Sequence, residues 1–527
     1  MLAALLVVAT LPHSVHAETA CEHLKTLRLP DTTIAVAESH AAGVESFDFQ
    51  GPPGVQTAPV KATVPAYCRV TGSIHPTADS DIRFELWMPA QGWNHRYEQV
   101  GNGGLAGAIL RTTLIEPLQQ HWAVAGTDDG HVGSSMSDGR WALGHPEKIT
   151  DYGYRAVHLT AQRSQAIVHA YYGAKAAHRY FVGCSDGGRE SLMEAQRYPG
   201  DFDGFVAGAP AQNIPSLVVG QVYRAQTAQA LGPNRLSDAQ MHFVIERELA
   251  HCDSLDGLKD GLIADPRRCD FDPRELVCGA PAAGEACLSS AQAEAIRKVY
   301  NGPHDSAAGT PLAYGYADTV GTEVPALRSG APPDAMGQQF FGNLVYGNPS
   351  LDPTTLDLTR AAHDAHERLG SMLDPSSPDL HGIKDSGKKI IQYHGWADPA
   401  VPAQLSLAYF ESVQKALGDT REFYRLFMVP GMGHCGGGIG PSWLTGNAVP
   451  HDNEHDVVLA LSHWVEDGVA PDQIIATEFD GPVPDPLNGP PAGTPIRSQR
   501  PVCAYPKVSQ YAGHGSTTVA ESFRCGT

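Results

Sequence analysis

Three residues of this chain have the types and the order that nucleophilic attack on a carbonyl group requires. Ser185 stands in the pentapeptide Gly-Cys-Ser-Asp-Gly at 183–187, and Asp398 and His434 follow it along the chain. A serine hydroxyl attacks a carbonyl carbon when a histidine takes its proton and a carboxylate fixes the tautomer of the imidazole. These residues therefore predict acyl transfer through an acyl-enzyme, with Ser185 as nucleophile, His434 as base and Asp398 as the orienting acid.

Each of the three residues comes directly after a segment rich in β-forming side chains. The segments are RYFVGC (179–184), KKIIQYHGWA (388–397) and FYRLFMVPGMG (423–433). In an α/β-hydrolase the serine, the acid and the histidine follow strand ends in this order. Taken singly they also fit a turn serine, an Asp-Pro turn and a loop histidine, and G-x-S-x-G alone is a weak motif. Their joint occurrence favours the catalytic interpretation.

Two cysteines flank the candidate catalytic residues. Cys184 precedes Ser185, and Cys435 follows His434. If the serine and the histidine lie within hydrogen-bond reach, the neighbouring cysteines approach disulfide distance. The alternative, two unrelated buried thiols, requires both to flank catalytic residues by accident. We therefore expect a bridge that fixes the strand end of the serine to that of the histidine.

Alternating strands and helices surround these segments. Apolar patterning predicts strands at 81–90, 95–104, 121–130 and 202–210, and helices at 150–173, 187–199 and 455–468. This order predicts an α/β fold with a mostly parallel sheet that is covered on both faces. Between Gly208 and Lys388 the pattern dissolves into Pro, Gly and Asp with four cysteines. We expect an inserted lid domain at 212–380 and an α/β-hydrolase domain made of 18–211 and 381–527.

Composition and charge narrow the class of partner. The chain has 527 residues, and 58 acidic against 37 basic residues give a net charge of −21. A nucleic-acid partner requires concentrated Lys and Arg, so we expect none. No segment after the first residues is long and apolar enough to span a membrane, and we expect no membrane partner.

The first residues predict export. An apolar run ends at Val15-His16-Ala17, which is typical of a signal peptide cleaved after residue 17. The basic segment that usually precedes such a run is missing, which leaves open a start upstream of Met1. Ten cysteines without a C-x-x-C pair favour disulfides over zinc. We expect a secreted or periplasmic protein.

The motifs around these residues resemble those of the tannase and feruloyl esterase family. The resemblance covers nearly the whole mature chain and rests on GCSDGGRESLMEAQRYP, CDSLDGLKDG, YHGWADP, VPGMGHC and RPVCAYP. It implies an α/β-hydrolase that cleaves aromatic esters, with the triad named above and the Cys184–Cys435 bridge. It further implies His394 as a substrate-pocket residue, although a buried structural histidine also fits. It also implies four more disulfides: Cys21–Cys68, Cys252–Cys269, Cys278–Cys287 and Cys503–Cys525.

The oxyanion of the intermediate requires two backbone N–H donors. Asp186, the residue after the nucleophile, supplies the first. The loop VGNGGLAG at 100–107 supplies the second, and the resemblance implies Gly104. The same loop, with Asp128 further on, also fits the dinucleotide-binding fingerprint. This loop makes a secreted oxidoreductase one alternative, which leaves Ser185, His434 and their flanking cysteines unexplained. A catalytically inactive α/β-hydrolase used for adhesion is another alternative, and the intact triad argues against it.

An acidic loop at 252–266 offers hard oxygen ligands from Asp253, Asp256 and Asp260. The loop alone fits either Ca²⁺ or a simple acidic turn, since its spacing is not that of an EF-hand. The resemblance implies a structural Ca²⁺ that is also bound by the backbone carbonyls of Leu258 and Leu262. No organic cofactor is expected.

The expected substrate is a small aromatic ester of plant cell-wall or polyphenol origin, with feruloyl (hydroxycinnamoyl) esters ahead of galloyl esters and of mono(2-hydroxyethyl) terephthalate. The lid stretch 329–358 contains no Arg or Lys to meet a terephthalate carboxylate. It does offer flat and neutral polar side chains that suit a phenolic ring, or else form lid core. These are Gln338, Gln339, Phe340, Phe341, Asn343 and Tyr346.

Overall fold

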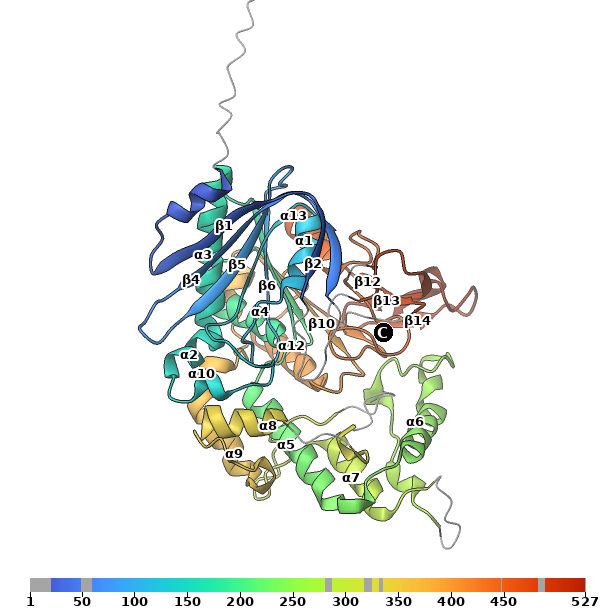
Figure 1. The fold of residues 1–527 in the computed structure, drawn as a ribbon. Helices are drawn as coiled ribbons and strands as arrows, with labels where there is room; N and C mark the ends of the chain where they lie inside the picture. Colours follow the sequence, from blue (N-terminus) through green and yellow to red (C-terminus); the bar gives the residue numbers. More distant parts are fainter. Residues whose placement is uncertain are drawn as a thin grey trace, which may run out of the picture.

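The computed structural model describes residues 20–48, 59–279, 287–316, 325–330, 335–446, 448–481 and 489–526. The signal peptide expected at 1–17 lies outside these residues. Figure 1 shows a twisted sheet with helices on both faces, a helical part below it and a group of short strands beside its last strands.

The central sheet has nine strands in the order β1-β4-β5-β7-β6-β8-β9-β10-β11. The pairs from β7 to β11 along this order are parallel, and the first three are antiparallel. The strand bounds are β1 Thr32–His40, β4 Tyr67–Ile74, β5 Ile82–Pro89, β6 Arg96–Val100, β7 Ala123–Thr127, β8 His178–Cys184, β9 Gly204–Gly208, β10 Lys389–Gly395 and β11 Tyr424–Val429. The strands expected around the candidate triad are therefore present, in a mostly parallel arrangement.

Successive side chains of the central strands enter different cores, because strand residues alternate between the two faces. Phe181 of β8 packs in the core that includes α3 (Ala156–Tyr172) and α12 (Gln404–Leu417). Its neighbour Tyr180 packs in the core formed with α13 (Val457–Asp467). Because Phe181 and Tyr180 point to opposite faces, α3 and α13 cover opposite faces of the sheet. Covering both faces fixes the strand register, and with it the strand ends that carry the site.

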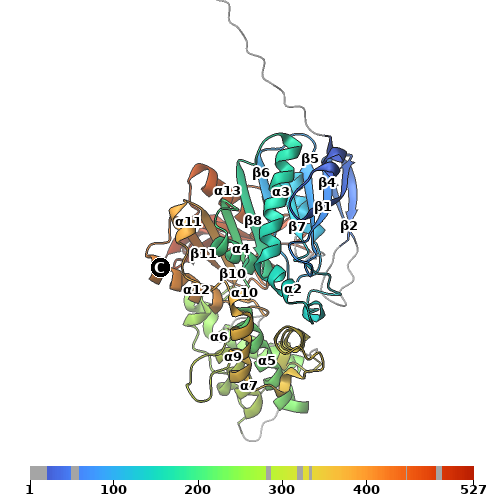
Figure 2. The same ribbon diagram turned by 90° about the vertical axis from the view of Figure 1, so that its left-hand side faces the viewer.

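Between β9 and β10 the chain forms a helical insertion (residues 212–380), where the sequence indicated little regular structure. Its helices are α5 Ile214–Leu231, α6 Asp238–Cys252, α7 Ser290–Asn301, α8 Ala335–Gln339, α9 Leu358–Ala365 and α10 Ser371–Leu373. In Figure 1 and in Figure 2 the insertion lies below the sheet. One of its cores consists of insertion residues alone, and another also contains Leu105, Ala106 and Tyr152 of the main sheet's loops and helices.

Short elements complete the fold. The small antiparallel pairs are β2 (Gly43–Phe47) with β3 (Val60–Val64), β12 (Gln473–Phe479) with β13 (Ile496–Cys503), and β14 (Val508–Tyr511) with β15 (Phe523–Gly526). The remaining α-helices are α1 Ile115–Gln119, α2 Pro146–Thr150, α4 Asp186–Arg197 and α11 His381–Asp385. A search of the described residues finds no helix with the length and apolar character needed to cross a membrane.

Candidate active site

Ser185 stands on a sharp turn between the end of β8 and the start of α4. Its backbone has φ 64° and ψ −120°, a left-handed conformation that is strained for any residue with a side chain. The turn depends on close backbone contact, because a Cβ added to Gly183 would lie 2.4 Å from the carbonyl carbon of Gly187. Small residues on both sides of the serine therefore let the chain lift its hydroxyl out of the strand.

The three sequence-predicted residues form one chain of hydrogen bonds. His434 Nε2 lies 2.8 Å from Ser185 Oγ, and His434 Nδ1 lies 2.7 Å from Asp398 Oδ2. The serine hydroxyl can donate to Nε2 only when Nδ1 carries the proton and donates to the carboxylate. This tautomer leaves Nε2 free to accept the serine proton.

Asp398 is buried, with its second oxygen accepting hydrogen bonds from the amides of Ala400 at 2.7 Å and Val401 at 2.9 Å. Burial opposes its ionisation, but the charge of His434 and hydrogen bonds from His394 and His434 outweigh this and hold the pKa of Asp398 below its usual range. Burial also acts against the charged form of His434, yet the Asp398 carboxylate raises the pKa of His434 above its ordinary value. The arrangement thus favours a positive imidazole beside a negative carboxylate.

His394, expected as a substrate-pocket residue, lies behind Asp398 and does not reach the cavity. It is fully buried, its Nδ1 lies 2.6 Å from Ser406 Oγ, and its Nε2 lies 3.1 Å from the carbonyl oxygen of Val401 and 3.3 Å from Asp398 Oδ2. The expectation is wrong because β10 directs this side chain into the core. Its contacts with Ser406, Val401 and Asp398 instead place it where it can hold the Asp398 carboxylate in position.

A disulfide joins Cys184 to Cys435 across a sequence separation of 251. The structure also joins the other eight cysteines in the four pairs that the resemblance implies, Cys21–Cys68, Cys252–Cys269, Cys278–Cys287 and Cys503–Cys525. The Cys184–Cys435 bridge connects the residue before Ser185 to the residue after His434. It therefore limits how far the serine and the histidine can separate.

Two amides beside Ser185 are free to face a developing oxyanion. Within the part of the chain that the structure describes, the N–H groups of Gly104 and Asp186 have no hydrogen-bond partner. Gly104 has φ +61°, and a Cβ there would lie 2.1 Å from the carbonyl oxygen of Met136, so only glycine fits. Asp186 is the first residue of α4, where an N–H has no partner within the helix.

Tyr152 connects the two amide-bearing segments, and sequence reasoning missed it. Its hydroxyl lies 2.9 Å from the carbonyl oxygen of Gly104 and 3.0 Å from Asp186 Oδ1, so one proton is shared between two acceptors. Burial and the charge of Asp186 raise the pKa of Tyr152 well above its ordinary value, which keeps the hydroxyl protonated. Arg189 completes this network by donating from Nε to Asp186 Oδ1 at 2.6 Å.

The loop that carries Gly104 is also held from its other side. The amide of Asn102 donates to Glu190 Oε2 at 3.0 Å, and the Asn102 side chain donates to the carbonyl oxygen of Thr127 at 2.9 Å. Asp128, the acid of the alternative dinucleotide fingerprint, is buried and accepts from the amides of Arg83 and Gly130. Its carboxylate is used to hold a turn, which removes the basis for a ribose contact.

The insertion aromatics that the sequence singled out do not line the cavity beside Ser185. Phe340 and Phe341 are fully buried in a core that includes Leu105 and Ala106, the residues after Gly104. The expectation that these rings face a substrate is wrong, because they pack between the insertion and the loop that carries Gly104. The alternative reading of this stretch as core is the one that the structure supports.

The acidic loop has a donor set that fits Ca²⁺. Asp253, Asp256 and Asp260 each accept a backbone N–H from within the loop, and burial together with the charges of Asp260 and Asp253 raises the pKa of Asp256. In the described chain, no hydrogen bond reaches the carbonyl oxygens of Leu258 and Leu262. Asp260 also pairs with Arg500. Carboxylates and carbonyl oxygens are the ligand types that a hard divalent cation prefers, and Ca²⁺ at this loop stays a prediction.

The comparison with known proteins decides the family. A family model described as "Tannase and feruloyl esterase" matches residues 68–526. The chain belongs to this family. An uncharacterized esterase of Xanthomonas campestris is 37% identical over 561 residues, covering 100% of this chain and 94% of that protein. A probable feruloyl esterase B-2 of Aspergillus terreus is 31% identical, covering 95% of this chain and 93% of that protein.

A solved structure agrees with this assignment. Feruloyl esterase B from Aspergillus oryzae superposes with a TM-score of 0.85 at 27% identity, covering 96% of this chain and 99% of that one. This tannase and feruloyl esterase family member thus has the expected α/β-hydrolase fold and is a carboxylic ester hydrolase.

Proposed function

We propose that Ser185, His434 and Asp398 hydrolyse an aromatic ester through an acyl-enzyme. The observation that carries this proposal is the continuous hydrogen-bonded chain from Ser185 Oγ through His434 to Asp398, beside two unpartnered amides. Ser185 Oγ bonds to the ester carbonyl carbon as its proton passes to His434 Nε2. Asp398 stabilises the imidazolium that forms.

The oxyanion that develops is stabilised by the N–H groups of Gly104 and Asp186. Collapse of the tetrahedral intermediate breaks the bond to the alcohol oxygen, which takes its proton from His434. A water molecule then gives a proton to His434 and attacks the acyl carbon. The second collapse returns the proton to Ser185 and releases the acid.

The proposed substrates are hydroxycinnamoyl esters such as feruloyl esters, ahead of galloyl esters and mono(2-hydroxyethyl) terephthalate. Support comes from relatives that carry feruloyl esterase names, at 31% identity in one case. The argument from Phe340 and Phe341 no longer contributes. Kinetics with methyl ferulate, methyl gallate and mono(2-hydroxyethyl) terephthalate test this order, and the highest kcat/KM on the terephthalate half-ester would contradict it.

The proposed ion is a structural Ca²⁺ held by the carboxylates of Asp253, Asp256 and Asp260 and the carbonyl oxygens of Leu258 and Leu262. When bound, it would offset the repulsion among the carboxylates and tie the loop together beside the Cys252–Cys269 bridge. Export to an oxidising compartment is part of the same proposal, and five disulfides support it.

The nucleophile is tested by Ser185→Ala, which should lower kcat by several orders of magnitude and leave the fold intact. Ser191→Ala is the matched control, since Ser191 is buried in α4, which follows Ser185, and its hydroxyl has no partner among the described residues. An organophosphate should add its mass to the peptide that contains position 185 in the wild type and in Ser191→Ala, but not in Ser185→Ala. Retention of more than a few per cent of the activity by Ser185→Ala would refute the assignment.

A further inference from the structure

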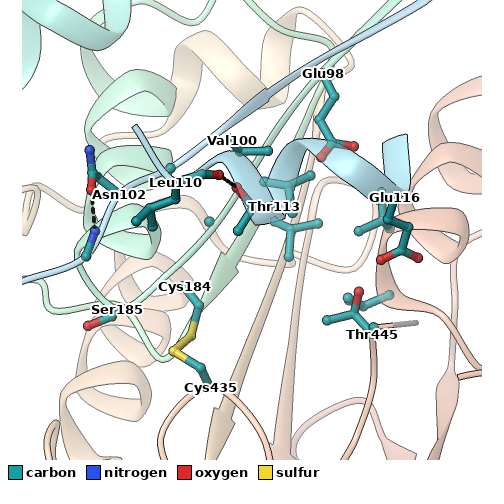
Figure 3. A pocket seen from close by; sticks show the side chains of 18 of the residues that line it. Glu98, Val100, Asn102, Leu110, Thr113, Glu116, Cys184, Ser185, Cys435 and Thr445 are labelled. Atoms are coloured by element: carbon teal, nitrogen blue, oxygen red, sulfur yellow. Dashed lines mark hydrogen bonds between the residues drawn. A yellow bond between two sulfur atoms is a disulfide. The ribbon is translucent and has the colours of Figure 1, made fainter. Parts of the chain in front are cut away.

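A partly open cavity of about 320 Å³ lies beside Ser185. Figure 3 shows Ser185 at one end, the Cys184–Cys435 bridge along the middle, and Glu98, Glu116 and Thr445 at the other end. Of the described residues that line it, none belongs to the insertion. A volume in this range is ordinary for a small-molecule site.

The walls of this cavity are mostly apolar. They come from β6, β8, β9 and the start of α13, together with the segment before α1, and include Val100, Leu110, Val182, Val206, Val457 and Val458. Thr113 is not available to a ligand as a donor, because its hydroxyl donates to the carbonyl oxygen of Leu110 at 2.7 Å. Such walls favour a flat apolar group over a charged chain.

Acidic side chains form the far end. Glu98 is 4% exposed, lines the cavity, and has no side-chain hydrogen bond to any described residue. Glu116 lies beside it, with Oε1 at 3.4 Å from Gln120 Nε2 and 3.5 Å from His451 Nδ1. An unpartnered buried carboxyl costs free energy that a ligand contact would recover.

The charges around this end decide which ligand it suits. Asp456 belongs to the same group, within 4.8 Å of Glu116 and His451, and accepts from the amides of Val458 and Leu459. Burial and the neighbouring carboxylates raise the pKa values of Glu98 and Glu116. Neutral carboxyl groups both donate and accept hydrogen bonds. They match a hydroxyl group, whereas a ligand carboxylate at this end would meet acids, and the described residues that line the cavity include no Lys or Arg.

We propose that this cavity binds the hydroxylated ring of an aromatic ester, with the ring between the valine side chains and its hydroxyl group hydrogen-bonded to Glu98 and Glu116. The inference rests on the proposed function, because it places the reacting carbonyl at Ser185. It makes Glu98 and Glu116 specificity-determining residues. The aromatic group then lies on the sheet side of the site, whereas the sequence had pointed to the insertion.

The test compares methyl 4-hydroxycinnamate with methyl cinnamate in the full-length protein. For Glu98→Leu, the ratio of their two kcat/KM values should fall about tenfold, because one buried hydrogen bond to the ring hydroxyl is lost. Glu98→Gln should retain part of the preference, since an amide still donates and accepts. Glu194→Gln is the matched control, because Glu194 is equally buried and unpartnered but does not line the cavity.

The outcomes separate this inference from the proposed function. A wild type that cleaves neither ester refutes the proposed function. A wild type that cleaves both, with the same ratio in Glu98→Leu, refutes the cavity assignment alone. If Glu98→Leu does not fold, a wild-type ratio in Glu98→Gln and Glu116→Gln, each with an unchanged melting temperature, refutes it equally.

Discussion

Removing the Tyr152 hydroxyl should slow the chemical step without weakening substrate binding. Tyr152 is fully buried in the π-helical segment Asp151–Arg155 that runs into α3, and its hydroxyl lies within 3.0 Å of both the Gly104 carbonyl oxygen and Asp186 Oδ1. Tyr152→Phe keeps the ring and its packing but leaves the Gly104 carbonyl without this donor. Asp186 is still held by Arg189. The variant therefore loosens one oxyanion donor and leaves the other in place.

The size of the effect follows from these contacts. Complete loss of an oxyanion donor lowers kcat by about 10²–10³. Here the Gly104 amide is misplaced rather than deleted, so we expect kcat to fall by about 10–50-fold, equivalent to about 1.4–2.3 kcal/mol of transition-state stabilisation. KM should stay close to the wild-type value, since the contact is made only in the transition state.

The assay is steady-state hydrolysis of methyl ferulate, with thermal unfolding followed in parallel. Tyr154→Phe is the control, because Tyr154 lies two residues away and its ring packs under Arg197, with 4.3 Å from the guanidinium carbon to the ring centroid. Wild-type kcat in Tyr152→Phe would refute the reasoning. A raised KM with unchanged kcat would refute it as well, because the hydroxyl would then act on substrate binding.

Three further predictions follow from the site and its supports. Neutral His434 is the reactive form, and the Asp398 carboxylate raises the pKa of His434. The value of kcat/KM should therefore fall as pH drops through a value above about 6.5. In a pH–rate profile, Asp398→Asn should shift this acidic limb to lower pH. Replacing Cys184 and Cys435 by serine should cost about 2–5 kcal/mol in denaturant unfolding and lower kcat, and mapping that finds both thiols free in the exported protein would contradict it. A chelator should lower the melting temperature and Ca²⁺ should restore it better than Mg²⁺, whereas an unchanged response in Asp256→Ala would leave the loop a simple turn.

The strand ends that hold the candidate triad could be predicted because each carries two local signals. Ser185, Asp398 and His434 combine a β-rich segment with a polar residue at its end, and a parallel sheet collects such ends at one edge. The bridge beside them followed from chain position alone. These local signals were enough to predict the triad, because the α/β-hydrolase fold itself brings the three strand ends together.

Other parts depended on tertiary neighbours. The helices α6 and α7 carry capping boxes, Ser237 with Gln240 and Ser289 with Gln292, and this signal was present but not used. Phe340 could not be assigned, because an aromatic ring suits a core and a pocket equally well until its neighbours are known. Glu98 was missed for a related reason: a single acid in a strand looks solvent-exposed unless both faces of the sheet are known to be covered.

The shared core of Phe340 and Phe341 with Leu105 and Ala106 has a consequence for redesign. An exchange of the insertion between members of the family would look like a modular way to transfer substrate preference. Here the insertion and the loop that carries Gly104 are complementary surfaces, so a transplanted insertion would meet a loop shaped for other side chains. A chimera should keep its activity only when residues 100–107 are exchanged together with the insertion. The part of the chain that must be transferred is therefore larger than the segment between β9 and β10.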